Sequence, residues 1–285
     1  MKVAVIGGLG VEHKEFNYKT QHTKCASLGG SAWWCALISR ALYNDTTIYS
    51  RIGNDYFGHL IKNQMNECSI KFLGNTNGST QHFFATLING NVDAYKSKGV
   101  NPRLYDVDNC FNDYKLYDII ILAFNDPEIV YSFSSFKKID DKSSKVANLS
   151  GSIIPFEKKY GIEMIQGFNI VTLNDHELDH LSKIKNTTMH NILNILSQKN
   201  ESVFVTSKSR VIYRIENNEF EYSFQVLPCV VNSIGAGDAF ATSLAIFYKE
   251  SGDICFSVAR AIGIAHKMCM LKNRSVITRE TLFYE

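Results

Sequence analysis

The sequence has 285 residues, of which 45% are hydrophobic and 20% are charged. A chain of this length and composition folds around a sizeable core, which excludes wholesale disorder. Thirty lysines and arginines against 28 acidic residues leave a formal charge of +2, too balanced for a protein whose main partner is nucleic acid. No apolar run approaches the roughly 20 residues of a membrane helix, and residues 1–8 lack a signal peptide's apolar stretch. We therefore expect a cytoplasmic protein with no membrane partner.

The seven cysteines are scattered along the chain and form no Cys-x-x-Cys pair. An odd number at irregular spacing does not resemble a disulfide framework. We interpret them as reduced thiols, most of them in the core, rather than as metal ligands.

Short apolar runs alternate with longer helical segments along most of the chain. The predicted strands are residues 3–6, 46–50, 119–124, 145–149, 170–173 and 203–206, and the predicted helices are residues 31–43, 55–67, 236–249 and 254–271. This alternation indicates βαβ crossovers. It predicts one α/β domain over residues 1–285, with a doubly wound, mostly parallel sheet and helices on both faces.

Two predicted hairpins interrupt this alternation. Residues 81–88 alternate in the manner of a strand and lead through Asn89-Gly90 into residues 92–96, which is a strong hairpin signal. A second hairpin is predicted around Asn217-Asn218. Each hairpin could form a small flap over a site or extend the edge of the main sheet.

The most informative segment is residues 232–240, Asn-Ser-Ile-Gly-Ala-Gly-Asp-Ala-Phe. It follows a strand-like run (224–231) and opens an apolar helix, so its glycines let the backbone approach a ligand closely. The first amides of a helix lack internal partners and bind anions. Asp238 would repel an anion there unless it has a task, such as accepting a proton from an attacking hydroxyl. The alternative is an ordinary glycine turn with an aspartate cap.

This segment resembles the C-terminal signature of the PfkB, or ribokinase-like, family of carbohydrate and nucleoside kinases, which residues 235–240 match without a change. Three weaker motifs follow the family's order: Gly29-Gly30 before a buried helix, Arg51-Ile52-Gly53-Asn54-Asp55-Tyr56-Phe57-Gly58, and Asn174-Asp175-His176-Glu177. The resemblance covers nearly the whole chain. It implies a ribokinase-like fold with a small β lid, whose strands are expected within 11–25 and 80–97.

The resemblance also implies roles for the residues of the signature. Asp238 would be the catalytic base, and the backbone amides of Gly235, Ala236 and Gly237 would form the anion hole for the transferring γ-phosphoryl group of ATP. Asn174 and Glu177 would organise Mg²⁺ and its waters, Glu177 being the metal-side residue. Without the resemblance, Asn174 and Glu177 would be taken for a plain helix start with capping.

Further nucleotide and substrate contacts follow from the same resemblance. The nucleotide-binding residues would be Thr206 at the end of a strand, Lys208 in the following loop, and Arg260 on the helix that faces adenine. The substrate-binding residues would be Glu12, Gly29, Gly30 and Trp34, with the hairpin at Asn89-Gly90 as a lid that excludes water. Each has a plainer alternative: Glu12 and Lys208 as solvated loop residues, and Trp33-Trp34 as helix core.

Several positions depart from the family pattern, among them Arg260, which stands where a smaller polar residue is more usual. Asn232 replaces the signature's first Asp, which helps to bind a monovalent cation in ribokinase-like enzymes, so activation by alkali ions is in doubt. Trp34 stands where an Asn commonly reaches the sugar, Lys208 where a Gly is usual, and Asn148 where many relatives have an Asp. These changes indicate an altered substrate or nucleotide pocket.

The resemblance implies a Mg²⁺- and ATP-dependent kinase that phosphorylates a hydroxyl of a sugar or sugar-like molecule. One alternative is a nucleoside kinase of the same family, with Trp33 or Trp34 stacking on the base. Another is a catalytically silent regulator that binds a sugar or nucleotide. A homodimer paired through the lid edges is a further hypothesis.

Overall fold

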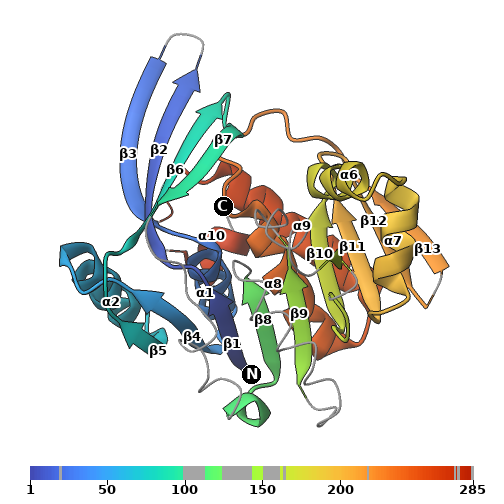
Figure 1. Cartoon of the computed structure of the whole chain (residues 1–285), viewed down its shortest axis with the longest axis horizontal. Coiled ribbons are helices and arrows are strands. Elements are labelled where there is room, and N and C mark those ends of the chain that lie inside the picture. The colour runs from blue at the N-terminus through green and yellow to red at the C-terminus, as the bar shows by residue number, and fades with distance from the viewer. Residues whose placement is uncertain are drawn as a thin grey trace.

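The computed structural model describes residues 1–18, 21–98, 113–123, 143–149, 161–162, 165–216, 218–272, 274 and 277–283. Its main feature is a nine-stranded sheet of order β13-β12-β11-β10-β9-β8-β1-β4-β5 (Figure 1). The parallel strands are β1 (Lys2–Gly7), β4 (Asp45–Ile52), β5 (Lys71–Thr76), β8 (Ile119–Ala123), β9 (Ser144–Asn148), β10 (Ile170–Asn174) and β11 (Ser202–Thr206). The antiparallel edge consists of β12 (Arg210–Ile215) and β13 (Asn218–Ser223).

Helices cover both faces of this sheet, as continuous apolar strands such as β1 and β8 require. One face packs against α1 (Ser31–Ala41), α8 (Ala236–Ser251) and α9 (Ile254–Met270), and the other against α6 (Asp175–Ile184) and α7 (Met189–Ser197). The described residues also form the helices α2 (Tyr56–Glu67) and α10 (Arg279–Phe283) and the short 3₁₀ turn η2 (Tyr114–Leu116). The doubly wound α/β prediction is confirmed. None of the helices in the described residues is long and apolar enough to cross a membrane.

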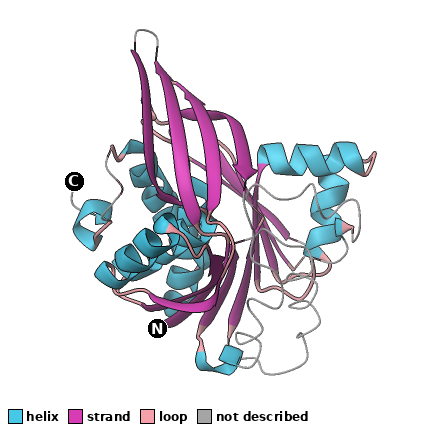
Figure 2. Ribbon diagram, turned by 60° about the vertical axis from the view of Figure 1, so that its left-hand side comes forward, coloured by secondary structure: helices cyan, strands magenta, loops and turns pink. Residues whose placement is uncertain are grey.

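A second sheet of four strands, in the order β3-β2-β6-β7, projects from the main sheet (Figures 1 and 2). Its strands are β2 (Gly10–Tyr18), β3 (Gln21–Gly29), β6 (Gln81–Ile88) and β7 (Asn91–Lys98), so the segments where lid strands are expected lie in this sheet. The turn at Asn89-Gly90 forms as predicted, with positive φ at both residues. We call this sheet the lid.

The Asn89-Gly90 turn, which we call the lid tip, contacts the segment that precedes α8. The amide of Ser233 donates to the carbonyl of Gly90 at 2.8 Å, and the amide of Val92 donates to the Ser233 hydroxyl at 3.2 Å. A Cβ atom at Gly90 would lie only 1.9 Å from the carbonyl oxygen of Val230, so the contact requires glycine. The lid therefore reaches the loop that the sequence singles out.

Two expectations differ from the structure, and one open alternative is resolved. The strand-like run 224–231 is irregular, because Pro228 cannot donate a ladder hydrogen bond and the Val231 amide donates to the carbonyl of Cys269 instead. The second hairpin extends the edge of the main sheet, with Ile215 opposite Asn218, and forms no flap. The described cysteines are free thiols, but only Cys35 is buried; Cys110 lies outside the described residues.

The Asp55 motif joins the main sheet to the lid. Asp55 caps α2, and its carboxylate accepts hydrogen bonds from the Gly58 amide at 2.9 Å and from the amide and hydroxyl of Thr80, beside β6. A Cβ atom at Gly53 would lie 2.1 Å from the Thr80 nitrogen, so this glycine permits the close approach. Burial opposes ionisation of Asp55, but the bonds from Thr80 and Gly58 outweigh it and hold the pKa of the carboxyl below its ordinary value.

We expect Asp55→Ala to lower the free energy of unfolding by about 1–3 kcal/mol at neutral pH, because three donors lose their acceptor. A lowered pKa contributes stability above the unfolded-state pKa of about 4, and this stability is lost as the pH falls through the folded-state value. Urea unfolding at neutral and acid pH should therefore show the difference between variant and wild type shrinking on acidification. Thr188→Ala, which removes an uncharged helix cap, serves as the control, and its cost should not change with pH. An Asp55→Ala cost independent of pH would contradict the assignment.

Candidate active site

The loop before α8 lies beside the carboxyl ends of the central strands, where open α/β sheets bind ligands. Gly235 is the N-cap of α8 and adopts φ +79°, a conformation that favours glycine. A Cβ atom there would also lie 2.8 Å from Cγ of Trp34, so the indole packs directly against the turn. Both conditions explain why the sequence has glycine at this position.

The three amides proposed for the anion hole differ in their partners. The amide of Ala236 donates to the carbonyl of Ser233 at 3.2 Å, so this turn uses it internally. Within the described part of the chain, the amides of Gly235 and Gly237 have no acceptor. A Cβ atom at Gly237 would meet nothing within 4 Å, and Gly237 lines a cleft. The first turn of α8 thus presents its amide-bearing backbone to open space.

Asp238 lies in the same helical turn and is 5% exposed. Its Oδ1 atom accepts a hydrogen bond from Nδ2 of Asn148 at 2.7 Å, and Oδ1 of Asn148 accepts one from the Thr172 hydroxyl at 3.1 Å. This chain of bonds fixes the carboxylate against the ends of β9 and β10. A small cavity of about 20 Å³ is lined by Asn148, the hydrogen-bond partner of the carboxylate, and by Gly237. Burial and the nearby Asp238 raise the pKa of the Cys35 thiol well above its ordinary value.

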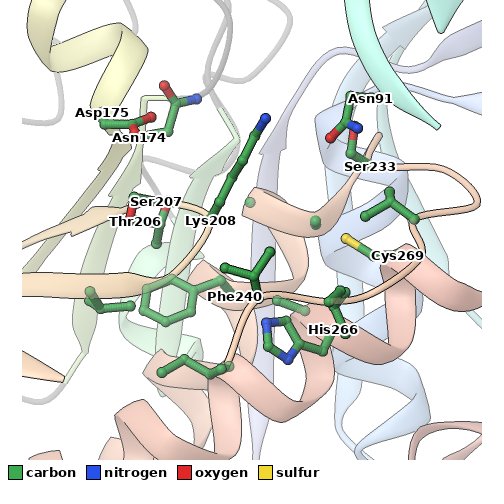
Figure 3. Close-up of a pocket in the computed structure, with 18 of the residues that line it drawn as sticks. Asn91, Asn174, Asp175, Thr206, Ser207, Lys208, Ser233, Phe240, His266 and Cys269 are labelled. Atoms are coloured by element: carbon green, nitrogen blue, oxygen red, sulfur yellow. The ribbon is translucent and has the colours of Figure 1, made fainter. Parts of the chain in front are cut away.

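The main cleft has a volume of about 540 Å³ and is open along one side of this loop (Figure 3). Its polar end contains Asn91 and Val92 of the lid, Ser233, Ala236 and Gly237 of the loop, and Asn174, Asp175, His176, Thr206, Ser207 and Lys208. Its apolar end is lined by Val211, Phe224, Val226, Leu227, Val230, Phe240, Ile262, Ala265, His266 and Cys269. Burial lowers the pKa of His266, which favours a neutral ring against the apolar wall. The cleft suits an elongated ligand with one flat apolar part and one anionic part.

The comparisons with known proteins agree with this geometry. Residues 2–276 match the profile described as pfkB family carbohydrate kinase. The chain belongs to the PfkB family. A comparison with curated protein sequences gives no match. The PfkB chain is a phosphotransferase that acts on a hydroxyl group.

Solved structures of kinases share the fold of this PfkB chain. Ribokinase from Giardia lamblia superimposes with a TM-score of 0.79 at 15% identity, covering 99% of this chain and 97% of that one. Ribokinase from Thermotoga maritima gives 0.74 at 16% identity, with coverages of 98% and 97%. Adenosine kinase from Sinorhizobium meliloti gives 0.78 at 14% identity, with coverages of 95% and 94%. At these identities the likeness establishes the ribokinase-like fold.

Asn174 and Glu177 of the PfkB chain form a capping box. The Asn174 side chain accepts from the Glu177 amide at 2.8 Å, and Oε2 of Glu177 accepts from the Asn174 amide at 2.7 Å. Both residues also line the small cavity beside Thr206 and Gly237. Among the described residues, no group of three or more His, Cys, Asp and Glu side chains could hold a metal ion.

The predicted nucleotide residues separate into two groups. Thr206 and Lys208 line the cleft with Asn174, and the Lys208 side chain extends between the sides that carry Asn174 and Asn91 (Figure 3). Arg260 is absent from the described lining, and its guanidinium lies over the rings of Phe247 and Phe283, at 5.5 and 4.5 Å from their centroids. Arg260 therefore supports the packing of α9 rather than the cleft.

The predicted substrate residues form a cluster next to the Gly235 turn, against which Trp34 packs, and the described lining of the cleft does not include them. Oε1 of Glu12 accepts from the Gly30 amide at 3.1 Å and from Nε1 of Trp34 at 2.9 Å, while Oε2 lies 3.2 Å from Nζ of Lys14. A Cβ atom at Gly29 would lie 2.1 Å from the carboxyl carbon of Glu12, so this glycine makes room for the carboxylate. The four predicted residues are brought together. Trp34, only 2% exposed, is nevertheless a core side chain.

Sequence reasoning missed the apolar end of the cleft and the contribution of the lid tip. Phe224, Val226 and Leu227 belong to the irregular segment that was predicted as a strand, so their exposure to a cleft was not foreseen. Asn91 could have been found, because it directly follows the Asn89-Gly90 turn. Asn148 was noted only as a departure from the family, although its position at the end of β9 directs it toward the site.

Proposed function

We propose that this PfkB kinase transfers the γ-phosphoryl group of ATP to a hydroxyl of a sugar or sugar-like small molecule. The observation that carries the proposal is the first turn of α8, where Gly237 lines an open cleft, its amide has no acceptor among the described residues, and the next residue is the buried acid Asp238. In-line phosphoryl transfer needs positioning and charge stabilisation rather than covalent chemistry. This turn supplies both within two residues.

ATP fits the polarity of the main cleft. Its base would lie at the apolar end, against Phe240 and His266, and its phosphates would reach toward the amides of Gly235 and Gly237. Lys208 would meet a phosphate as a point charge. Thr206 borders the same end of the cleft.

Mg²⁺ would neutralise charge on the phosphates, and Asn174 and Glu177 are the oxygen donors that border its expected position. Their donor chemistry fits this hard cation. Because each is already held in the capping box, contact through water is the arrangement that we propose.

Asp238 would accept the proton of the attacking hydroxyl. A carboxylate has lone pairs beyond the one that accepts from Asn148, so it can receive this proton while remaining oriented. The Asn148 amide keeps one carboxylate oxygen in place and is itself positioned by Thr172. As the proton leaves, the hydroxyl oxygen becomes the nucleophile, and the amides stabilise charge on the moving phosphoryl group.

The substrate side remains assigned to Glu12, Gly29 and Gly30. A sugar hydroxyl would compete with Lys14 for the Oε2 atom of Glu12, so substrate binding is coupled to that ion pair. The nucleoside alternative depended on an aromatic face from Trp33 or Trp34, and both side chains are 2% exposed. The buried indoles remove the stacking face on which the nucleoside alternative depended.

The test is ADP release with Mg²⁺ and ATP across a panel of sugars, sugar derivatives and nucleosides. We expect turnover with at least one sugar-like acceptor above the ATP hydrolysis seen without acceptor. Turnover confined to nucleosides would select the alternative substrate class. A thermal-shift panel with the same compounds identifies ligands independently, since a bound ligand raises the unfolding temperature. Binding without ADP release for every compound would overturn the proposal in favour of a silent regulator.

A further inference from the structure

Arg274 lies between α9 and α10, and it is 6% exposed. Its Nη1 atom donates to the carbonyl oxygen of Ile234, and its Nη2 atom donates to the carbonyl oxygens of Asn232 and Met268. Two of these three acceptors belong to the loop that carries the anion hole. A buried guanidinium thus binds two backbone carbonyls of this loop.

The surroundings of Arg274 keep its charge in place. The guanidinium carbon lies 5.8 Å from the centroid of the Trp34 ring, the same indole that packs against Gly235. Glu12 and Cys269 are the titratable groups that face it from the neighbouring elements. Burial lowers the pKa of Arg274 to about 10, which leaves it charged at neutral pH. At neutral pH a positive charge therefore lies beside the loop carbonyls.

The two loop carbonyls that Arg274 holds, those of Asn232 and Ile234, determine where the two following amides point. In a trans peptide the C=O and the next N–H point in opposite directions. Because the Asn232 carbonyl points toward Arg274, the Ser233 amide points away from it and donates to the carbonyl of Gly90 in the lid at 2.8 Å. The Ile234 carbonyl also points toward Arg274, so the Gly235 amide points away from it. This amide has no acceptor among the described residues. One guanidinium orients both peptide units.

We propose that Arg274 is a positioning residue, an internal cation that orients the Ser233 amide toward the lid and the Gly235 amide toward the transferring phosphoryl group. Three converging carbonyl oxygens are also a ligand set for a free monovalent cation, and the guanidinium occupies that place. The kinase therefore needs no added monovalent cation. The part of this inference that concerns phosphoryl transfer rests on the proposed function, whereas the carbonyl clamp does not.

The first test measures thermal unfolding and is independent of activity. Arg274→Ala leaves three inward-facing carbonyls, so guanidinium or K⁺ at non-denaturing concentration should stabilise this variant relative to tetramethylammonium at equal ionic strength. At about five times its dissociation constant, a bound ion should raise the unfolding temperature by about 2–4 °C. Wild type and Arg279→Ala, whose exposed guanidinium lies over Tyr43 and Phe283, should show no such difference between the salts. A folded Arg274→Ala that responds to neither ion overturns the proposal.

The second test measures turnover with the acceptor found in the screen. Arg274→Ala should lower kcat by about 10–100-fold, with less effect on KM for ATP, because a misplaced donor harms the transition state most. Guanidinium should restore part of kcat, and Arg274→Lys, which keeps the charge, should retain more activity than the alanine variant. If the alanine variant does not fold in any salt, the wild type decides. Equal turnover and unfolding temperature in K⁺, Na⁺ and tetramethylammonium salts support the proposal, and activation or stabilisation by K⁺ overturns it.

If wild type shows no kinase activity, the proposed function fails, yet the unfolding experiment still decides whether Arg274 acts as the cation of this carbonyl cluster. The two failures are therefore distinguishable.

Discussion

Asp238→Asn should lower the rate of phosphoryl transfer by about 10²–10⁴-fold, because an amide cannot accept the proton of the attacking hydroxyl. Affinity for a non-hydrolysable ATP analogue should remain nearly unchanged, since the cleft and the loop amides are not altered. The new side chain keeps a carbonyl oxygen that can accept from Asn148, so the fold should be retained. Single-turnover kinetics measures the first effect, and calorimetric titration of the analogue measures the second.

The matched control is Asp253→Asn. Asp253 caps α9 by accepting a hydrogen bond from the Phe256 amide. Its replacement by Asn is the same chemical change, made at an exposed helix N-terminus. Because Asn caps helices as well as Asp does, this variant should keep wild-type turnover and stability. Undiminished transfer in Asp238→Asn would remove the proposed role of the carboxylate.

Gly237→Ala should abolish most of the activity without destabilising the protein. A Cβ atom at this position meets no protein atom within 4 Å, but it would project where Gly237 borders the cleft and would obstruct the approach of a phosphoryl group. We expect a loss of about 10²-fold in kcat, comparable with removal of one anion-hole donor. The free energy of unfolding should stay equal or rise by about 0.5–1 kcal/mol, because alanine is the better helix former.

Gly263→Ala provides the comparison for Gly237→Ala. Gly263 lies on an exposed part of α9, and a Cβ atom there also meets nothing within 4 Å. Urea unfolding should show the same gain in stability for both variants. Turnover should be lost only in Gly237→Ala. Full activity in a correctly folded Gly237→Ala would show that the transferring group does not approach this turn.

Local patterns in the sequence predicted the elements that depend on local physics. Apolar runs such as residues 3–6 and 119–124 indicated buried parallel strands, and the positive-φ turn at Asn89-Gly90 was readable from two residues. The Gly-Ala-Gly-Asp segment indicated a helix start with exposed amides. Asp55 and Asn174 lie at helix N-termini, where side chains of their type cap.

Contacts between residues far apart in sequence could not be predicted in the same way. The docking of Gly90 on Ser233 and the bonds from Arg274 to Asn232 depend on how the sheets and α9 pack, and no local pattern encodes them. Trp34 illustrates the limit. An indole after a glycine turn can face a ligand or the core, and only its bond to Glu12 and its packing against Gly235 decide for the core.

The most direct test of the central claim follows the backbone amides of the loop while a non-hydrolysable ATP analogue is added with Mg²⁺. In ¹H–¹⁵N spectra, the amide resonances of Gly235 and Gly237 should move downfield on saturation as they gain an anionic acceptor, while that of Gly263 should remain fixed. If the analogue binds and these two resonances do not move, the phosphates lie elsewhere and the account of phosphoryl transfer is wrong.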